Sequence, residues 1–390
     1  MTPKHDTAAG LYIHVPFCAS VCPYCDFAVT ITNPDRRASY LLGVPAEAAM
    51  RAGMDLVFDS VYFGGGTPSR LSGDQLEGLL QGIRGHLDVL PVPRVFLEVN
   101  PEDVTADSVA AWRSIGVDTI SLGVQSFDDE ILRCLGRRHT VDQSRRALDM
   151  LQNSGFSTVS IDLIYGVEGQ TAEAWQRGLD EAADRRVDHL SCYQLTFHSG
   201  TIFGRRLAAG QSAEIPTDAQ AEFFLLTHLM LADHGYDGYE VSSFASAPEH
   251  RSVHNQKYWS HEPYLGIGPS AHSFVERRRW WNRRKLRLWQ RDVDGGRLPE
   301  GGSEDLTDTD LALEAVMLGL RTREGVDLGR LRHRFDLDLV AVNQTTLDRL
   351  CDDGHLELDG GMLRPTLTGM AIADTLARSL DVSTNGRPSS

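Results

Sequence analysis

The chain has 390 residues, of which 41% are hydrophobic and 24% charged, proportions that are ordinary for a globular protein. No apolar run approaches the roughly 20 residues that a membrane-spanning helix needs, and neither a signal peptide nor an arginine-rich targeting sequence is recognisable, so a cytoplasmic protein is expected. A formal net charge of −16 argues against non-specific binding to nucleic acid, which requires a basic surface.

Six short apolar runs, rich in β-branched or aromatic residues, recur in the first half of the chain, and each is followed by a segment that suits a helix. These runs begin at Leu11, Ser60, Val95, Thr119, Thr158 and His189. Strands that alternate with helices predict a parallel sheet, and six such units predict a partial (β/α)6 barrel within an α/β fold. Apolar residues recur at helical spacing in 71–87, 105–116 and 142–155, which supports this interpretation.

Three cysteines, Cys18, Cys22 and Cys25, follow the first predicted strand with the spacing C-x3-C-x2-C. In a reducing compartment, clustered cysteines are more typical of metal binding or redox work than of disulfides. A [4Fe–4S] cluster is normally held by four thiolates, so three cysteines would hold it and leave one iron open. A zinc site that recruits His14 and a chance cluster are the alternatives. The other cysteines are interpreted as small core residues: Cys134, Cys192 and Cys351.

The second predicted strand ends in three consecutive glycines, Gly64, Gly65 and Gly66, within YFGGGTPS. Glycines leave the backbone open to close approach by a ligand, although a tight turn would use them equally well. Later strands carry polar residues at or near their carboxyl ends, which lie on the working face of a barrel. One rim is therefore expected to gather the cysteines, the glycines and these residues: Glu98, Gln125 and Asp162.

The carboxyl-terminal part of the chain is predicted to form a second, smaller domain. The segment 295–304, GGRLPEGGSE, has the composition of a linker, so residues 1–294 would form the barrel with an extension and 305–390 the second domain. Helical patterns around a short hairpin over 356–366 are typical of a helical, winged-helix-like domain. Its acidic residues leave no basic stripe for DNA, so a packing or regulatory role is expected.

Together these motifs resemble the radical S-adenosylmethionine (SAM) superfamily, in which the cysteine loop holds a [4Fe–4S] cluster and SAM chelates the open iron. From about Leu11 to Leu380 the chain is similar to the branch that contains oxygen-independent coproporphyrinogen III oxidases (HemN) and heme chaperones (HemW). The similarity is carried by these stretches: YIHVPFCASVCPYCDF, YFGGGTPS, LEVNPE, ISLGVQSF, LGRRH, SIDLIYGVEGQT, SCYQLTF and HNQKYWSHEPYLGIGPSAHSF.

The resemblance implies roles for individual residues. The three cysteines would bind the cluster, and the three glycines would meet the methionine end of SAM. Six further residues would surround the cluster or the carboxylate, ribose and adenine of SAM: Tyr12, Glu98, Gln125, Arg137, Asp162 and Ile164. Carboxylates and an amide suit hydroxyl groups, and an arginine suits a carboxylate. As an alternative, Glu98 or Asp162 would be a solvated acid at the end of a strand.

Two features favour a heme chaperone over the oxidase. The cysteine motif ends C-x-F at Phe27, where the oxidases continue with a further cysteine, and only a short segment precedes Leu11. HNQKYW fits the HNxxY pattern of the chaperones, in which His254 would contact heme iron beside the flat surfaces of Tyr258 and Trp259. A histidine that only orients a loop is the alternative.

The resemblance implies heme as cargo and a heme-acceptor protein, for example a membrane-bound respiratory protein. The alternatives within the branch are enzymes that cleave SAM to a 5′-deoxyadenosyl radical with the help of an electron donor. Such an enzyme would be a coproporphyrinogen III dehydrogenase or a HemN-like methylase.

Two segments have open interpretations. The stretch 276–291, ERRRWWNRRKLRLWQR, would be a solvated strand or helix face, or it would pair with propionates or an acidic partner. Pro45 lies inside the first predicted barrel helix and is expected to break or kink it.

Overall fold

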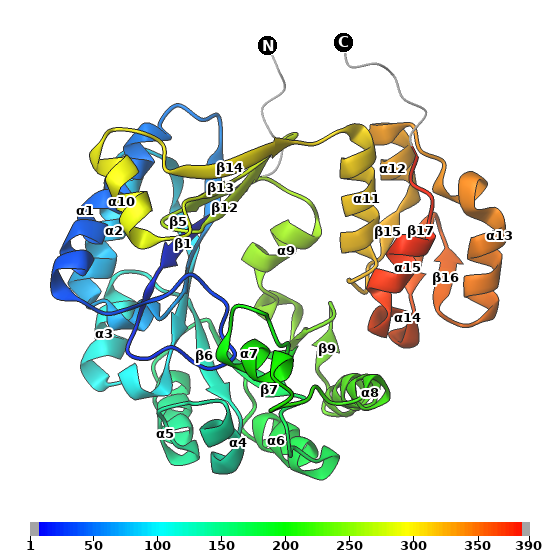
Figure 1. The fold of residues 1–390 in the computed structure, drawn as a ribbon, viewed down its shortest axis with the longest axis horizontal. Helices are drawn as coiled ribbons and strands as arrows, with labels where there is room; N and C mark the ends of the chain where they lie inside the picture. The colour runs from blue at the N-terminus through cyan, green and yellow to red at the C-terminus, as the bar shows by residue number, and fades with distance from the viewer. Residues whose placement is uncertain (1–7, 384–390) are drawn as a thin grey trace.

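One large sheet dominates the computed structural model, which describes residues 8–383 (Figure 1). Its twelve strands lie in the order β14-β13-β12-β11-β1-β4-β5-β6-β7-β8-β10-β9. The central six strands are parallel: β1 (Ala9–Val15), β4 (Val57–Gly65), β5 (Asp88–Val99), β6 (Thr119–Gln125), β7 (Thr158–Tyr165) and β8 (His189–Gln194). Each pairs with the next along the chain, which confirms the predicted partial (β/α)6 barrel.

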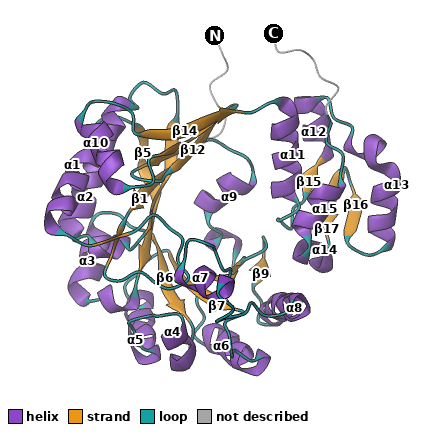
Figure 2. Cartoon of the chain, in the orientation of Figure 1, coloured by secondary structure: helices purple, strands orange, loops and turns teal. Residues whose placement is uncertain are grey.

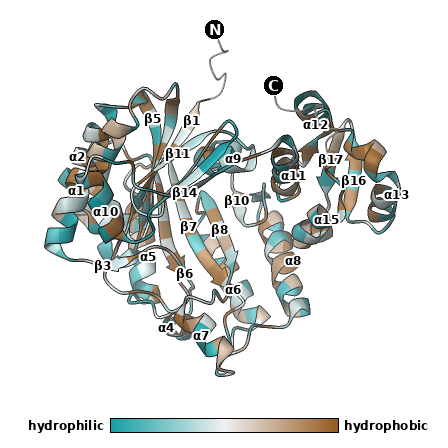
Figure 3. Ribbon diagram, turned by 45° about the horizontal axis from the view of Figure 1, so that its top comes forward, coloured by the Kyte–Doolittle hydropathy of each residue, from teal (hydrophilic) through white to brown (hydrophobic). Residues whose placement is uncertain are grey.

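Helices follow the parallel strands and cover the outside of the sheet (Figure 2). They are α1 (Pro34–Met50), α2 (Gly73–Arg84), α3 (Ala106–Ser114), α4 (Asp129–Cys134), α5 (Val141–Gln152) and α6 (Ala172–Asp184). Ser72, Thr105 and Thr140 begin α2, α3 and α5, and each forms a capping box that satisfies free N–H groups of the first turn. Hydrophobic stretches run through the central strands, and the surrounding helices carry both hydrophobic and hydrophilic residues (Figure 3).

A break or a kink was predicted at Pro45, and the break does not occur, because helix α1 is continuous from Pro34 to Met50. The proline ring faces Gly82 of α2, where a Cβ atom would lie 2.6 Å from Pro45 Cγ. Because Gly82 has no side chain, α2 leaves room for the ring between the two helices.

Four strands extend the sheet beyond β1, namely β11 (Tyr264–Ile267), β12 (His272–Val275), β13 (Arg278–Asn282) and β14 (Glu300–Asp305). The second half of the segment expected as a linker is therefore strand β14, because its backbone pairs with β13. The Arg/Trp stretch forms β13 and the start of α10 (Leu286–Asp294), and it buries Trp280 and Trp289.

A buried carboxylate joins this extension to the barrel. Glu47 of α1 accepts hydrogen bonds from the Gly268 backbone N–H at 2.9 Å, from Asn282 Nδ2 at 2.6 Å and from Trp289 Nε1 at 2.7 Å. Burial raises the pKa of Glu47 to about 7. One side chain thus fixes the loop after β11, the end of β13 and helix α10.

Glu47→Ala is expected to lower the free energy of unfolding by about 3 kcal/mol, because three buried donors lose their acceptor. Urea denaturation at constant pH measures the change. Glu77→Ala on the exposed side of α2 is the matched control and should change stability little. If Glu47→Ala is as stable as the wild type, the carboxylate does not hold the extension in place.

The other edge of the sheet ends in β10 (Ser243–Ala245) and β9 (Asp237–Gly238), with α8 (Thr217–Asp233) packed nearby. None of the helices within residues 8–383 combines the length and apolarity that a bilayer crossing demands.

The carboxyl-terminal elements form a separate lobe with its own hydrophobic cluster (Figure 1). They are α11 (Asp308–Gly319), β15 (Val326–Asp327), α12 (Leu328–Phe335), α13 (Leu339–Asp352), β16 (Leu356–Asp359), β17 (Met362–Pro365), α14 (Leu367–Ala371) and α15 (Ala373–Ser379). Strands β16 and β17 form the predicted hairpin. Helix α9 (Val253–Trp259) lies between this lobe and the sheet, in contact with α11, β1 and β4.

Candidate functional site

The carboxyl ends of the parallel strands open into a cavity of about 470 Å³. Most of the predicted site residues line it: Cys18, Cys22, Cys25, Gly65, Gly66, Glu98, Gln125, Arg137, Asp162 and Ile164. Three predicted residues do not: Tyr12, Gly64 and His254. The expectation that one rim gathers the unusual residues is therefore met for the cysteines, the acids and two of the glycines.

The three cysteines belong to a loop whose ends are tied together by the pairing of β2 (Phe17–Cys18) with β3 (Thr30–Ile31). Burial raises the pKa of the Cys18 thiol and raises that of Cys25 to about 11. Such thiols become thiolates when a bound cation compensates their charge. This donor set fits a metal group.

The zinc alternative depends on His14 as a fourth ligand. His14 Nδ1 lies 3.2 Å from the Tyr12 hydroxyl, and Nε2 lies 3.0 Å from the Ala28 carbonyl. Because both ring nitrogens are engaged, His14 is not placed to complete a zinc site. A cluster in which each thiolate binds a different iron needs no such ligand from the protein.

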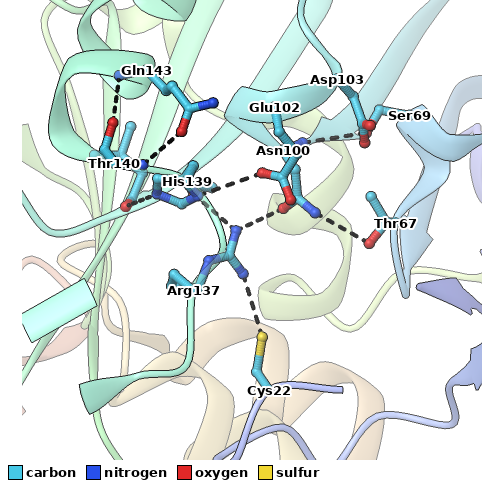
Figure 4. A network of polar contacts seen from close by, with 12 residues as sticks. Cys22, Thr67, Ser69, Asn100, Glu102, Asp103, Arg137, His139, Thr140 and Gln143 are labelled. Atoms are coloured by element: carbon cyan, nitrogen blue, oxygen red, sulfur yellow. Dashed lines mark hydrogen bonds and ion pairs between the residues drawn. The ribbon is translucent and has the colours of Figure 1, made fainter. Parts of the chain in front are cut away.

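A chain of polar contacts leads from Cys22 through Arg137 and Asn100 to Thr67 (Figure 4), and Thr67 extends it to Cys18. Arg137 Nη1 lies 3.7 Å from Cys22 Sγ, and Nη2 donates to Asn100 Oδ1 at 2.7 Å. The Asn100 amide donates to the Thr67 hydroxyl at 3.4 Å, which in turn lies 3.5 Å from Cys18 Sγ. Asn100 and Thr67 were not among the predicted site residues, although both fall in the stretches LEVNPE and YFGGGTPS.

The glycine loop is packed too closely for side chains. A Cβ atom on Gly64 would lie 2.8 Å from Tyr62 Cε1 and 2.9 Å from both Tyr12 Cε2 and Glu98 Oε1. Gly65 has a φ of 110°, which glycine adopts freely, and its N–H donates to Glu98 Oε2 at 2.9 Å. Gly65 and Gly66 therefore present bare backbone to the cavity, whereas Gly64 packs against Tyr12 and Tyr62.

Two carboxyl groups face the cavity in place of the solvated strand-end acids considered as the alternative. Burial, and to a lesser extent the nearby Asp162, raises the pKa of Glu98 to about 7. Burial also raises the pKa of Asp162 to about 6, although the Ser121 hydroxyl donates to both of its oxygens at 3.0 and 3.1 Å. This wall can accept hydrogen bonds from ligand hydroxyl or ammonium groups once both acids are ionised.

Gln125 ends β6 with a φ of 65°, a left-handed conformation that is uncommon outside glycine. The pairing of β6 with β7 shifts register between Leu122 and Gln125, so the strand bulges there. Such local strain clusters at binding sites, and here it accompanies an amide that lines the cavity.

His254 lies in the interior of the protein. Its side chain is 1% exposed, Nδ1 is 3.0 Å from the Ser60 hydroxyl and Nε2 is 2.8 Å from the Tyr258 hydroxyl. Its ring centroid is 5.1 Å from that of Tyr62, and burial lowers its pKa to about 3. The predicted contact with heme iron does not fit this geometry, because both ring nitrogens are engaged. The alternative, a histidine that orients its surroundings, fits.

The cysteines outside the loop differ in their surroundings. Cys192 is buried and Cys351 partly buried, as small core residues would be, but Cys134 is exposed at the end of α4, so its assignment to the core is wrong.

Comparisons with known proteins cover both lobes. Residues 12–182 match the radical SAM superfamily, and residues 306–372 match the HemN C-terminal domain. The heme chaperone HemW of Mycobacterium tuberculosis is 34% identical over 388 residues, which cover 97% of this chain and 96% of that protein. HemW of Escherichia coli is 35% identical over 68% of this chain and 70% of its own.

Among solved structures, coproporphyrinogen III oxidase (HemN) from Escherichia coli, described as a radical SAM enzyme, is similar with a TM-score of 0.82 and 25% identity. The match covers 95% of this chain and 89% of the oxidase.

Proposed function

Because the chain belongs to the HemW family within the radical SAM superfamily, we propose that it is a heme chaperone, which binds heme and delivers it to acceptor proteins. The observation that carries this proposal is the end-to-end similarity to a heme chaperone, 34% identity over 97% of the chain. Phe27, which stands where the related oxidases have a further cysteine, supports the same choice. A membrane-bound respiratory protein would be a suitable acceptor.

Membership of the superfamily implies a [4Fe–4S] cluster and SAM. We assign the cluster to Cys18, Cys22 and Cys25, whose thiols line one cavity and need a positive group to ionise. When bound, the cluster and SAM supply one-electron reductive chemistry, for which an electron-donor protein would be the partner. Arg137 and Thr67 donate toward the cysteine sulfurs and so stabilise their charged form.

The remaining cavity wall suits SAM. Gly65 and Gly66 line the cavity where its methionine end would lie, next to Gly64, and Arg137 supplies a guanidinium for the carboxylate. Three polar side chains and one apolar residue would receive the ammonium, ribose and adenine: Glu98, Gln125, Asp162 and Ile164. Tyr12 would support the glycine loop without touching SAM, because it packs against Gly64 and does not line the cavity.

SAM affinity is expected to weaken about tenfold between about pH 8 and about pH 5.5. The pKa values of Glu98 and Asp162 are raised to about 7 and about 6, so both acids gain protons in this range and no longer attract the positively charged ligand. Equilibrium dialysis with labelled SAM measures this, with the iron content checked at each pH. Glu98→Gln should flatten the profile, whereas Glu77→Gln should not. If the SAM affinity of the wild type does not change with pH, neither acid contributes to SAM binding.

An anaerobic titration of the cluster-loaded protein with hemin, followed by the Soret band, tests the proposed function. Saturable binding is expected, together with transfer of heme to a heme-free acceptor protein. The alternative is an enzyme that acts on coproporphyrinogen III or another substrate. Absence of specific heme binding, combined with SAM-dependent turnover of coproporphyrinogen III, would replace the chaperone with that enzyme.

A further inference from the structure

A basic surface lies on helix α10 and the loop that precedes it, beside α1 (Figure 1). Residues 283–297 combine six arginines or lysines with two aspartates, a net charge of +4 in a chain whose formal net charge is −16. Three arginines share the buried carboxylate of Asp292 at 3.0 to 3.1 Å, namely Arg283, Arg291 and Arg297. One carboxylate balances only one of these three cations, so a positive surplus remains, which suits an acidic partner.

Two cations connect this surface to the cysteine loop, residues 18–31. Arg284 donates to the backbone carbonyl of Asp26, and Arg36 of α1 donates to the Thr30 hydroxyl at 3.4 Å. Both arginines are exposed, and within residues 8–383 neither forms an ion pair with a carboxylate. The positive charge therefore extends from α10 to the edge of the loop that carries the three cysteines.

Lys285 and Arg287 add two cations that no carboxylate neutralises. Both residues are exposed, and the part of the chain that the structure describes offers neither side chain a hydrogen bond or an ion pair. On the neighbouring strand β13, by contrast, Arg278 and Arg279 are both paired with glutamates. Unpaired cations on a protein of net negative charge attract an acidic macromolecule to one side of the molecule.

Apolar side chains are exposed on the cysteine loop itself. Phe27 is 60% exposed and Ile31 is 52% exposed. Each directly follows a residue that a cation contacts, because Arg284 binds the carbonyl of the residue before Phe27, and Arg36 binds the hydroxyl of the residue before Ile31. An apolar centre with charged groups around it is the composition of a protein–protein interface.

This surface is next to the residues assigned to the cluster. Phe27 follows Cys25 by two residues, so their Cα atoms are at most about 7.6 Å apart. The rate of electron transfer between proteins falls steeply with distance, and a carrier seated on Phe27 brings its cofactor close to the cysteine loop. The position of the surface therefore favours an electron-transfer protein among the acidic partners that its charge would attract.

We infer that an acidic one-electron carrier protein docks on this surface and reduces the cluster. Phe27 and Ile31 form the apolar centre of the contact, and four cations around them receive acidic side chains of the carrier: Arg36, Arg284, Lys285 and Arg287. The carrier gives up one electron, which reduces the cluster, and no bond forms or breaks. The inference rests on the proposed function, in which an electron-donor protein is the partner of the cluster and SAM.

Calorimetric titration of the cluster-loaded protein with a bacterial flavodoxin, an acidic carrier that holds FMN, tests the surface. Lys285→Glu with Arg287→Glu should weaken binding at least tenfold at low ionic strength, and the affinity of the wild type should fall as salt screens the attraction. Because neither side chain has a partner in the described residues, this double variant should fold normally. Arg330→Glu with Arg349→Glu, exposed in the other lobe, is the matched control and should bind flavodoxin like the wild type.

Stopped-flow reduction of the cluster gives a second readout. Flavodoxin hydroquinone should reduce the Lys285→Glu, Arg287→Glu variant at least ten times more slowly than the wild type. Dithionite, a small reductant that needs no docking, should reduce both proteins at similar rates. Equal flavodoxin affinity and equal reduction rates in the two proteins would overturn the inference and leave the chaperone function standing, since hemin titration tests that function separately.

Two other outcomes would also overturn the inference. If the double variant binds flavodoxin like the wild type but no longer transfers heme to an acceptor protein, the surface belongs to the acceptor and not to an electron carrier. If dithionite reduces no cluster in the wild type, the cluster assigned under the proposed function fails, and the inference fails with it.

Discussion

Cys22→Ala protein is expected to contain almost no iron after anaerobic reconstitution, against about four irons per chain in the wild type. Cys18, Cys22 and Cys25 line the cavity, and without Cys22 a second iron of the cluster would lose its protein ligand. Arg137 would also lose its sulfur contact at 3.7 Å. Iron and sulfide assays, together with the broad visible absorbance of the cluster, measure the loss.

Cys134→Ala is the matched control, because Cys134 is exposed and lies outside the cavity. It should keep the full iron content. If Cys22→Ala retained its iron while another cysteine variant lost it, the assignment of the cluster to this loop would be wrong.

His254→Ala is expected to lower the free energy of unfolding by about 3 kcal/mol and to leave the affinity for heme nearly unchanged. The substitution empties a buried position and leaves two hydroxyls, of Ser60 and Tyr258, without their partner. Urea denaturation gives the stability, and hemin titration of the folded variant gives the affinity.

Tyr258→Phe removes one of the two hydrogen bonds without a cavity, and about 1 kcal/mol is the expected loss. The comparison separates the two roles of the histidine. A folded, stable His254→Ala protein that no longer binds hemin would return His254 to the position of heme ligand and contradict the role inferred from its buried geometry.

The barrel could be predicted from the sequence because each parallel strand is a short apolar run, and such runs are determined locally. The structure at Pro45 and at residues 300–305 could not be predicted from the sequence, because it depends on partners elsewhere in the chain. Gly82 of α2 makes room for the proline ring, and strand β13 supplies the hydrogen bonds that turn a glycine-rich segment into β14. Local composition contains no information about either partner.

The site shows the same division. Residues near the carboxyl ends of parallel strands lie on one rim, so Glu98 and Asp162 could be placed on that rim from the predicted strands, and the family resemblance supplied their roles. The direction of His254 could not, since it depends on α9 packing against Ser60 of a distant strand. Asn100 and Thr67 were missed because their role is to connect Arg137 to Cys18, which is visible only once three loops are brought together.

The position of α9 between the sheet and α11 makes the inner end of the cavity depend on the carboxyl-terminal lobe. Arg251, Ser252 and Asn255 line that end, and Arg251 is tied to Glu324 of the lobe by an ion pair of 2.8 Å. In a chain cut after Asp305, α9 would lose its contacts with α11, and Arg251 would lose its ion pair with Glu324. Bulk water would then reach the cavity at the end lined by Arg251, Ser252 and Asn255. Amide hydrogen exchange of α9 would then rise by orders of magnitude, so the small lobe protects the chemistry of the large one from a distance.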